Sequence, residues 1–268
     1  MVVPRVIVSL VLVDHYFYTT YKYRKFTYLG DPVNIIKILN EKKIDELAII
    51  APYAYRTGID YEYLSLLNRY ANMPVSYTGG IRQLSDARRI LKSGYEKVGV
   101  NTLFYERPEI VADLVDSFGS SSVIGVLDLK QNLFGSYKKY VHITKKVKDF
   151  RTSDIKELVD KSKVGELVVN NVTRNGTWKG LDFELHNSLD AQLGIPVIHS
   201  GGIGSTEEFF APNSHGLSLM AGNVFSFQKN GFGVMFNYPT ERVLNNRRLF
   251  AMNAAKRIIE ELGHLNEE

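Results

Sequence analysis

The segment MPVSYTGGI at residues 73–81 recurs as IPVIHSGGI at residues 195–203, an offset of 122 residues. The same offset relates Asn101 to Asn223. Each copy of the segment is a short apolar run that ends in Gly-Gly, which is typical of a buried strand followed by a tight turn. Because the similarity extends over more than one strand, it indicates an internal duplication of the fold.

Short β-branched runs alternate with longer segments of helical period along the whole chain. The expected strands lie at residues 5–13, 46–50, 73–80, 97–102, 122–129, 166–171, 195–202 and 216–223. The expected helices begin near Asp31, Tyr61, Ser85, Pro108, Ser153, Asp182 and Ser205, and one more follows the last strand. Eight βα units predict an α/β protein, a single (β/α)8 TIM barrel with duplicated half-barrels that occupies residues 1–268 as one domain. Periodicity alone leaves a doubly wound open sheet as the alternative.

Composition narrows the classes of partner and cofactor. The chain has no cysteine, which excludes disulfides and thiolate chemistry, and its six histidines lack metal-ligand spacing. The apolar run at residues 6–13 is far shorter than a membrane span, and no cleavage site follows it. The net charge of +4 comes without a nucleic-acid motif. We therefore expect a cytoplasmic protein with no metal, no cofactor, and no nucleic-acid or membrane partner.

Two segments fall outside the repeat, and both follow strands on the face where barrel enzymes bind their substrates. QNLFGSYKKYVHITKKVKDF at residues 131–150 is expected to form an inserted hairpin, with Gly135 between its alternating arms. YFYTTYKYRKFTY at residues 16–28 is aromatic and basic. Their side chains either form a solvated surface or bind an acidic partner or a nucleotide-linked sugar; they are Tyr21, Lys22, Tyr23, Arg24, Lys25, Lys138, Lys139, Lys145, Lys146 and Lys148.

Several motifs resemble the cyclase subunit, HisF, of imidazole glycerol phosphate synthase. Besides the Gly-Gly turns, they are GDP at 30–32, IDEL at 44–47, KVGVNT at 97–102, VLDLK at 126–130 and NGTWKG at 175–180. The match is nearly collinear from Arg5 to Asn223. More narrowly, QNLFGSYKKYVH (131–142) and VFSFQKNGFGVMFNYP (224–239) resemble the HisF-like glycosyl amidation-associated proteins of surface-polysaccharide gene clusters.

The resemblance implies that two aspartates at the top of the barrel act as acid and base in the cyclase. Here they fall on Val11 and Asp128, and valine cannot transfer a proton. Three other polar residues of the cyclase site, a lysine and two aspartates, fall on Thr19, Ala51 and Asn175. Since the loss of one acid or base typically costs about two to four orders of magnitude in rate, we expect no cyclase reaction. Asp128 is then a vestigial catalytic residue or, alternatively, a hydrogen-bond partner of the hairpin.

The resemblance also implies a glutaminase subunit at the N-terminal face of the barrel and an ammonia passage with a charged gate. The gate falls on Arg5, Glu46, Lys97 and Glu166. Strand alternation independently directs these four side chains inward at the lower end, where opposite charges neutralise one another. The alternative is an ion-pair cluster that serves only stability. Glu96 matches an acidic position of the family's glutaminase interface.

Above the gate, inward-facing small or neutral side chains would leave room for ammonia; they are Ile7, Ser9, Ala48, Ser76, Gly99 and Val168. The predicted channel residues are Ser76, Asn101 and Ser200. Backbone amides at turns before helices bind phosphate, and Ser205 with Glu208 has the spacing of a capping box. The predicted phosphate site comprises Gly79, Gly80, Thr102, Gly201, Gly202 and Asn223. The alternative is that the glycines serve the turns alone, and Thr78, where the family has glycine, disfavours the first half of this site.

Three functions remain as hypotheses. The leading one is an ammonia-channelling, glutaminase-activating subunit that supplies a sugar amidotransferase on the C-terminal face, for acetamidino-sugar formation in surface polysaccharide such as lipopolysaccharide O-antigen. The second is a working cyclase subunit of histidine biosynthesis. The third is a barrel that binds a phosphorylated ligand through its Gly-Gly turns and has no glutaminase partner.

Overall fold

The computed structural model describes residues 4–132, 135–149, 151–211, 216–227 and 233–264. Parallel strands form a closed barrel, because β10 pairs with β7 and β12 pairs with β1. The prediction of a (β/α)8 barrel is confirmed, and the open sheet is excluded. The barrel strands are β1 (Val6–Val13), β4 (Glu46–Ile50), β5 (Val75–Thr78), β6 (Lys97–Val100), β7 (Val123–Gln131), β10 (Glu166–Asn171), β11 (Val197–Ser200) and β12 (Ser218–Ala221).

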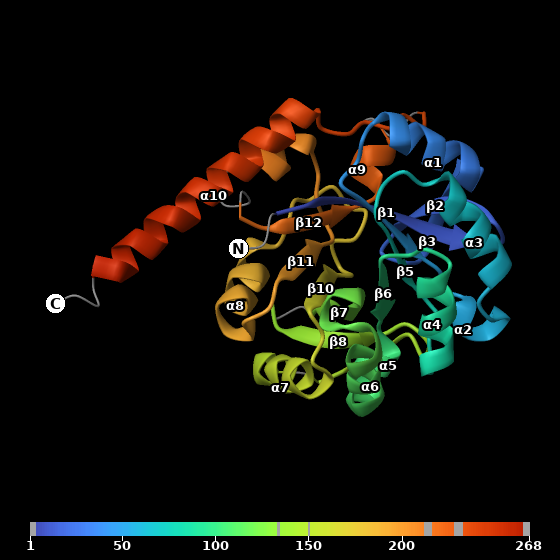
Figure 1. Ribbon diagram of the computed structural model, residues 1–268, viewed down its shortest axis with the longest axis horizontal. Helices are drawn as coiled ribbons and strands as arrows, with labels where there is room; N and C mark the ends of the chain where they lie inside the picture. The colour runs from blue at the N-terminus through green and yellow to red at the C-terminus, as the bar shows by residue number, and fades with distance from the viewer. Residues whose placement is uncertain (1–3, 133–134, 150, 212–215, 228–232, 265–268) are drawn as a thin grey trace.

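Helices surround the barrel, as Figure 1 shows. They are α1 (Pro32–Glu41), α3 (Tyr61–Tyr70), α4 (Leu84–Lys92), α6 (Pro108–Phe118), α7 (Thr152–Ser162) and α8 (Phe183–Leu193), with the short α2 (Ala54–Thr57), α5 (Thr102–Glu106), α9 (Asn223–Ser226) and the 3₁₀ turn η1 (Ser120–Ser122). Local sequence explains where several begin. Asp31 caps α1 by accepting a hydrogen bond from the backbone amide of Asn34, and Pro32 fills the first helical position.

The helix expected from Ser205 is absent from the described residues, and this prediction was wrong. The segment forms only a 3₁₀ turn, η2 (Thr206–Phe210), and the Ser205 side chain makes no capping hydrogen bond. Glu208, expected to complete the capping box, instead accepts hydrogen bonds from the backbone amides of Gly204 and Leu181. Its carboxylate therefore joins two loops rather than starting a helix.

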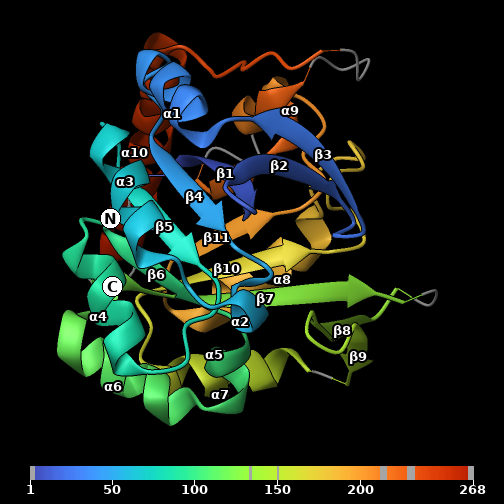
Figure 2. The same cartoon turned by 90° about the vertical axis from the view of Figure 1, so that its right-hand side faces the viewer.

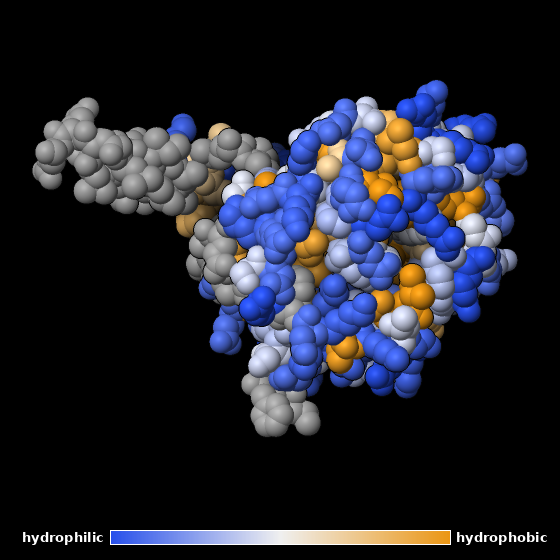
Figure 3. Space-filling view, turned by 90° about the horizontal axis from the view of Figure 1, so that it is seen from below, coloured by the Kyte–Doolittle hydropathy of each residue, from blue (hydrophilic) through white to orange (hydrophobic). Residues whose placement is uncertain are grey.

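The last helix, α10 (Glu241–His264), extends away from the barrel (Figure 1). Its first turns are attached by two arginines. Arg247 donates a 2.7 Å hydrogen bond to the carbonyl of Phe209, and Arg248 forms a 2.5 Å ion pair with Asp45. No helix in the described ranges is long and apolar enough to span a membrane. The side formed by α6 and α7 is largely hydrophilic, with small separate apolar patches (Figure 3).

Two antiparallel extensions lie at the C-terminal end of the barrel, on the right-hand side of Figure 2. One consists of β2 (Tyr16–Tyr21) and β3 (Lys25–Gly30), which continue β1 as a hairpin. The other consists of β8 (Tyr137–Val141) and β9 (Lys146–Lys148), which fold back on β7. The second extension occupies the segment where a hairpin was expected, although residues 133–134 and 150 lie outside the described residues. Pairing of the first extension was not predicted.

The main apolar core lies between the barrel and its helices. A second, smaller cluster lines the inside of the barrel with Ile7, Ala48, Ile124, Val168, Ile198 and Met220. Strand alternation explains this separation, because successive side chains point to opposite faces of the sheet. The inner cluster therefore forms the wall of whatever space the barrel encloses.

Candidate functional site

Four charged side chains meet at the N-terminal end of the barrel, and we call them the lower quartet: Arg5, Glu46, Lys97 and Glu166. The Arg5 guanidinium lies 2.6 Å from both the Glu46 and Glu166 carboxylates. The Lys97 ammonium lies 2.9 Å from Glu166 and 4.0 Å from Glu46. The inward direction expected for these side chains therefore corresponds to their position, and each cation contacts both anions.

Burial and pairing act in opposite directions on the pKa values of Arg5 and Glu46. Burial lowers the pKa of Arg5, but the Glu46 and Glu166 carboxylates outweigh it, so the net pKa is raised. Burial raises the pKa of Glu46 although Arg5 and Lys97 oppose that effect. Glu46 is 3% exposed and Lys97 is 9% exposed, so both depend on their partners for compensation of lost hydration.

Glu96, the predicted contact with a partner, is exposed immediately before β6 at the same end of the barrel. Its carboxylate is close enough to raise the pKa of Arg5. The backbone amide of Glu96 donates to the carbonyl of Val75, which fixes the residue at the barrel rim. Its role as a partner contact stays a prediction.

A cavity of about 370 Å³ extends upward from the lower quartet, and we call it the lumen. Glu46 lines its lower end, and Asp128 and His142 line its upper end. Most positions predicted to face inward do line it: Ile7, Ala48, Ser76, Gly99, Val168 and the predicted channel residue Asn101. Ser9 and Ser200 line a separate pocket instead. Ile124, Ile198 and Met220 also line the wall and were not predicted from the sequence.

Asp128 lies in a network of hydrogen bonds at the top of the lumen. Its carboxylate accepts hydrogen bonds from the side-chain amides of Asn101 (2.8 Å) and Asn170 (2.6 Å). The Nε2 atom of His142, from the turn after β8, lies 2.9 Å from the same carboxylate. Asp128 therefore has the position expected under the alternative interpretation, as a hydrogen-bond partner of the inserted hairpin.

His142 and Tyr23 meet above this carboxylate, and sequence reasoning gave neither a specific role. Their rings pack edge to face with centroids 4.7 Å apart, and the Tyr23 hydroxyl accepts a 3.1 Å hydrogen bond from Asn170. Burial lowers the pKa of His142, but the Asp128 charge and hydrogen bond outweigh it and the net pKa is raised. Burial, followed by the Asp128 charge, raises the pKa of Tyr23. Two inserted segments are thus joined over one carboxylate.

The two Gly-Gly turns are not brought together in one site. Gly79, Gly80 and Thr102 line the lumen, whereas Gly201, Gly202 and Asn223 line the separate pocket of about 40 Å³. A Cβ atom on Gly79 would lie 2.3 Å from the Ala51 carbonyl oxygen, so the backbone alone requires glycine there. The Thr78 hydroxyl occupies the space above Gly99 inside the barrel. Phosphate binding at either turn stays a prediction.

The four positions that depart from the cyclase lie around both hollows. Val11 is buried and Thr19 is 3% exposed; both line the small pocket together with Asn175. Ala51 is buried and lines the lumen. Asn175 accepts a 2.9 Å hydrogen bond from the Thr20 hydroxyl, so a neutral amide occupies the position where the cyclase has a carboxylate. None of these four side chains can act as a general acid or base at neutral pH.

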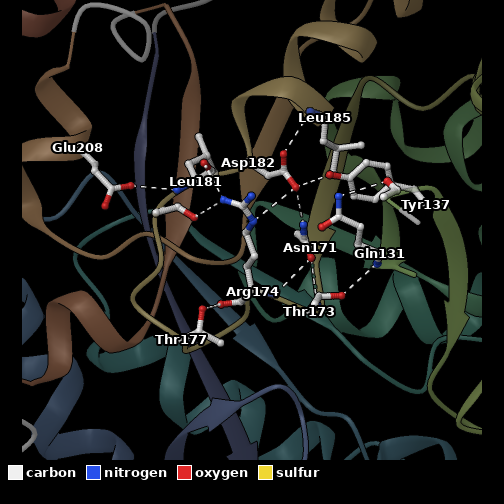
Figure 4. A network of polar contacts seen from close by, with 12 residues as sticks. Gln131, Tyr137, Asn171, Thr173, Arg174, Thr177, Leu181, Asp182, Leu185 and Glu208 are labelled. Atoms are coloured by element: carbon white, nitrogen blue, oxygen red, sulfur yellow. Dashed lines mark hydrogen bonds and ion pairs between the residues drawn. The ribbon is translucent and has the colours of Figure 1, made fainter. Parts of the chain in front are cut away.

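A second polar network holds the loop between β10 and α8 (Figure 4). Asp182 accepts hydrogen bonds from Asn171 (2.8 Å) and from the Tyr137 hydroxyl of β8, and lies 3.5 Å from Arg174. Arg174 in turn donates to the carbonyls of Gly180 and Leu181. The inserted hairpin is therefore fixed to the barrel at two places, Asp128 and Asp182.

No group of three or more metal-ligating side chains occurs within the described part of the chain. His199, the histidine beside the second Gly-Gly turn, lies in the core and hydrogen bonds through Nδ1 to Nδ1 of His186. Both rings are fully buried. A ring nitrogen that donates on one imidazole and one that accepts on the other explain this contact.

Comparison with known proteins agrees with this architecture. Residues 16–230 match the family model described as histidine biosynthesis protein. A Pseudomonas aeruginosa protein whose name proposes it as imidazole glycerol phosphate synthase subunit hisF2 is 32% identical over 245 residues, covering 89% of this chain and 97% of its own length. A Leptospira interrogans protein, proposed by its name as subunit HisF, is 31% identical over 244 residues, covering 89% and 96%.

A further relative is imidazole glycerol phosphate synthase subunit HisF of Thermococcus gammatolerans. It is 28% identical over 247 residues, which covers 90% of this chain and 97% of the relative. The similarity thus extends over nearly the whole chain. The chain belongs to the histidine biosynthesis protein family, as a HisF-like barrel.

Proposed function

We propose that this HisF-like barrel conducts ammonia from a class I glutaminase bound at its N-terminal face to a sugar amidotransferase at its C-terminal face. The barrel also activates the glutaminase. The ammonia forms an acetamidino group on a sugar of a surface polysaccharide. Relatives are named as subunits of imidazole glycerol phosphate synthase, and the amidotransferase role goes beyond those names.

One observation carries the proposal: a complete charged quartet opens into a lumen that continues to the top of a barrel whose upper site has lost one of its two proton-transferring aspartates. Glu46 belongs to both the quartet and the lumen wall. The wall above it is apolar, with Ala48, Ser76 and Gly99 as its small members. An apolar, narrow passage favours neutral ammonia over ammonium, because a charged ion loses far more hydration energy on entry.

The upper site supports a conduit rather than a cyclase. Val11 replaces one of the two proton-transferring groups, and the remaining Asp128 is bound by three hydrogen-bond partners. Proton transfer by a positioned group contributes about two to four orders of magnitude to a rate, so a site with Val11, Ala51 and Asn175 is a poor cyclase. The basic and aromatic hairpins that surround this end provide a surface for an acceptor enzyme.

The test is glutamine hydrolysis by a class I glutaminase from the same organism, with and without the purified barrel. The barrel should stimulate glutamate formation by about 5- to 150-fold, the usual range of coupling between sites. Lys97→Met should remove most of that stimulation while the complex still forms. Lys163→Met is the matched control, because Lys163 pairs with Asp116 at an exposed position of the same end.

Two outcomes would count against the proposal. A barrel that co-purifies with the glutaminase without stimulating it, or a Lys97→Met variant that stimulates like Lys163→Met, would remove the gate from the mechanism. Turnover of the cyclase's ribulosyl substrate with ammonium salt would instead favour histidine biosynthesis. If no complex with a glutaminase forms, the third hypothesis would be favoured, in which the barrel binds a phosphorylated ligand through its Gly-Gly turns.

A further inference from the structure

The two hollows at the top of the barrel are rimmed by different loops. The upper rim of the lumen comes from the loops that follow β4, β5 and β6, and from Ile143 of the inserted hairpin. In the described part of the chain, no residue of the loops after β10, β11 or β12 lines it. Those loops, residues 175–176, 201–203 and 222–223, line the small pocket instead. The lumen is therefore off-centre at its upper end.

Side chains from the two inserted segments stand between these hollows. Tyr23, Ile50 and Met220 line both cavities, so they form the shared wall. Tyr23 comes from the tip of the β2–β3 hairpin, which is held by a 2.9 Å hydrogen bond from the Lys22 amide to the Asn175 carbonyl. His142 closes the remaining side through its contacts with Tyr23 and Asp128. Tyr23 and His142 are called the partition below.

Hydrogen bonds hold the partition from below as well as from the sides. Asn170, which is 2% exposed, donates to both Tyr23 and Asp128, and Asn101 donates to Asp128. Removing one buried partner would leave the others unpaired, which is destabilising for a buried polar group. The partition is accordingly a fixed part of the barrel mouth and not a loosely packed loop.

We infer that the lumen opens to the C-terminal face on the side of β4 to β6 only, through a port rimmed by Tyr55, Arg82, Leu103, Glu106, Arg107 and, from the inserted hairpin, Ile143. The partition directs a molecule in the lumen toward this port and away from the second Gly-Gly turn. That the molecule is ammonia rests on the proposed function. The acceptor site of the upper partner then lies over β4 to β6, where the exposed Arg82 and Arg107 favour an acidic contact surface.

The chain contains no cysteine, so a single introduced thiol reports solvent access without background. Ser76→Cys places a thiol in the lumen, and Ser200→Cys places one in the small pocket. Both serines are similarly buried, at 5% and 6% exposure, which makes the pair matched. The rate of alkylation of each variant by iodoacetamide is measured by mass spectrometry, after circular dichroism and thermal melting have shown that each variant is folded.

Port and partition are then altered separately. Leu103→Trp narrows the port and should slow alkylation of the Ser76→Cys thiol by roughly tenfold, because labelling follows the population of the accessible state. Thr27→Trp, at an exposed site on β3 that lines neither cavity, should leave the rate unchanged. Tyr23→Ala opens the partition. It should accelerate alkylation of the Ser200→Cys thiol by roughly tenfold and have little effect on alkylation of the Ser76→Cys thiol.

Two results would overturn the inference. If Leu103→Trp slows labelling no more than Thr27→Trp, the port is not the way out of the lumen. If Tyr23→Ala accelerates alkylation of both thiols equally, the lumen opens at the centre of the barrel and the partition covers that opening. The assay contains neither glutaminase nor glutamine, so its outcome is independent of whether the barrel conducts ammonia.

Discussion

The Nε2 atom of His142 lies 2.9 Å from the Oδ2 atom of Asp128, and this contact connects an inserted hairpin to the end of a barrel strand. The carboxylate side chain is 6% exposed and the imidazole 26% exposed. An ion pair in such a position is little screened by solvent, so it depends on the protonation of the histidine.

The pair predicts a pH-dependent stability. Because the folded pKa of His142 is raised, its contribution is fully present below the unfolded pKa of about 6.5 and is lost as pH rises through the folded pKa. His142→Gln should therefore lower the melting temperature at pH 5.5 more than at pH 9. His15→Gln is the control, because His15 pairs with Asp60 at a largely exposed site and should change stability by less than about 0.5 kcal/mol. An equal loss at both pH values would contradict the prediction.

We expect that breaking the lower quartet lowers the free energy of unfolding much more than breaking an exposed ion pair does. Arg5→Met leaves two carboxylates, Glu46 and Glu166, with Lys97 as their only cation in the quartet. Breaking a buried pair in this way typically costs about 3 to 5 kcal/mol. Lys163→Met, which removes an exposed pair with Asp116, should cost less than about 1 kcal/mol. Urea unfolding of both variants measures the difference, and similar costs would show that the quartet is solvated.

The barrel and the quartet could be predicted from sequence because both follow from local periodicity. Runs of β-branched residues ending in Gly-Gly mark strands and turns, and alternation along a strand fixes which side chain points inward. Arg5 and Glu46 each begin a strand, so their shared direction needed no knowledge of the loops.

The upper end could not be predicted in the same way, because it depends on the register of two hairpins. His142 reaches Asp128 only because β8 pairs Lys139 with Leu129. Tyr23 reaches Asn170 because β2 and β3 pair with a register shift at Phe17/Tyr18. A one-residue slip in either hairpin would move the turn that carries the ring, and neither turn sequence specifies the register strongly enough. Glu208 failed as a cap for a related reason, since its partner Leu181 is 27 residues away.

The buried histidine pair predicts acid sensitivity. Burial, followed by the nearby His199, lowers the pKa of His186 to about 2. The unfolded chain binds this proton below pH of about 6.5 and the folded chain does not, so stability falls with decreasing pH by up to about 1.4 kcal/mol per unit. His186→Asn should flatten the loss of stability between pH 6 and pH 4 relative to the wild-type protein. Parallel pH profiles would show that the pair does not control acid unfolding.

The first Gly-Gly turn has no space for a side chain at Gly79, whether or not the turn binds a ligand. Gly79→Ala would place a Cβ atom 2.3 Å from the Ala51 carbonyl oxygen at a φ of +148°. Gly58 also has positive φ, at +84°, but nothing lies within 4 Å of its Cβ position. Gly58→Ala should therefore cost only backbone strain of about 1 to 3 kcal/mol, and Gly79→Ala clearly more. Thermal melting of the two variants tests this, and equal costs would contradict it.

The hydrogen bond between Tyr137 and Asp182 is the second attachment of the inserted hairpin, and its removal should loosen the hairpin locally. The Tyr137 hydroxyl donates to Asp182, and burial followed by that carboxylate raises the pKa of Tyr137, so the donor stays protonated at neutral pH. Tyr137→Phe removes a hydrogen bond to a charged group, worth about 1.5 to 3 kcal/mol. Asp182 keeps its bonds from Asn171 and from the amide of Leu185, so α8 should remain capped.

Hydrogen exchange distinguishes these two elements. In Tyr137→Phe, the amides of β8 that pair with β7 should exchange faster, while those of α8 should keep their protection. Tyr140→Phe on the same strand is the control and should leave both elements unchanged. Equal acceleration in β8 and α8 would mean that the hydroxyl stabilises the cap of α8 and not the hairpin, in which case Asp128 and His142 alone would hold the insertion over the barrel mouth.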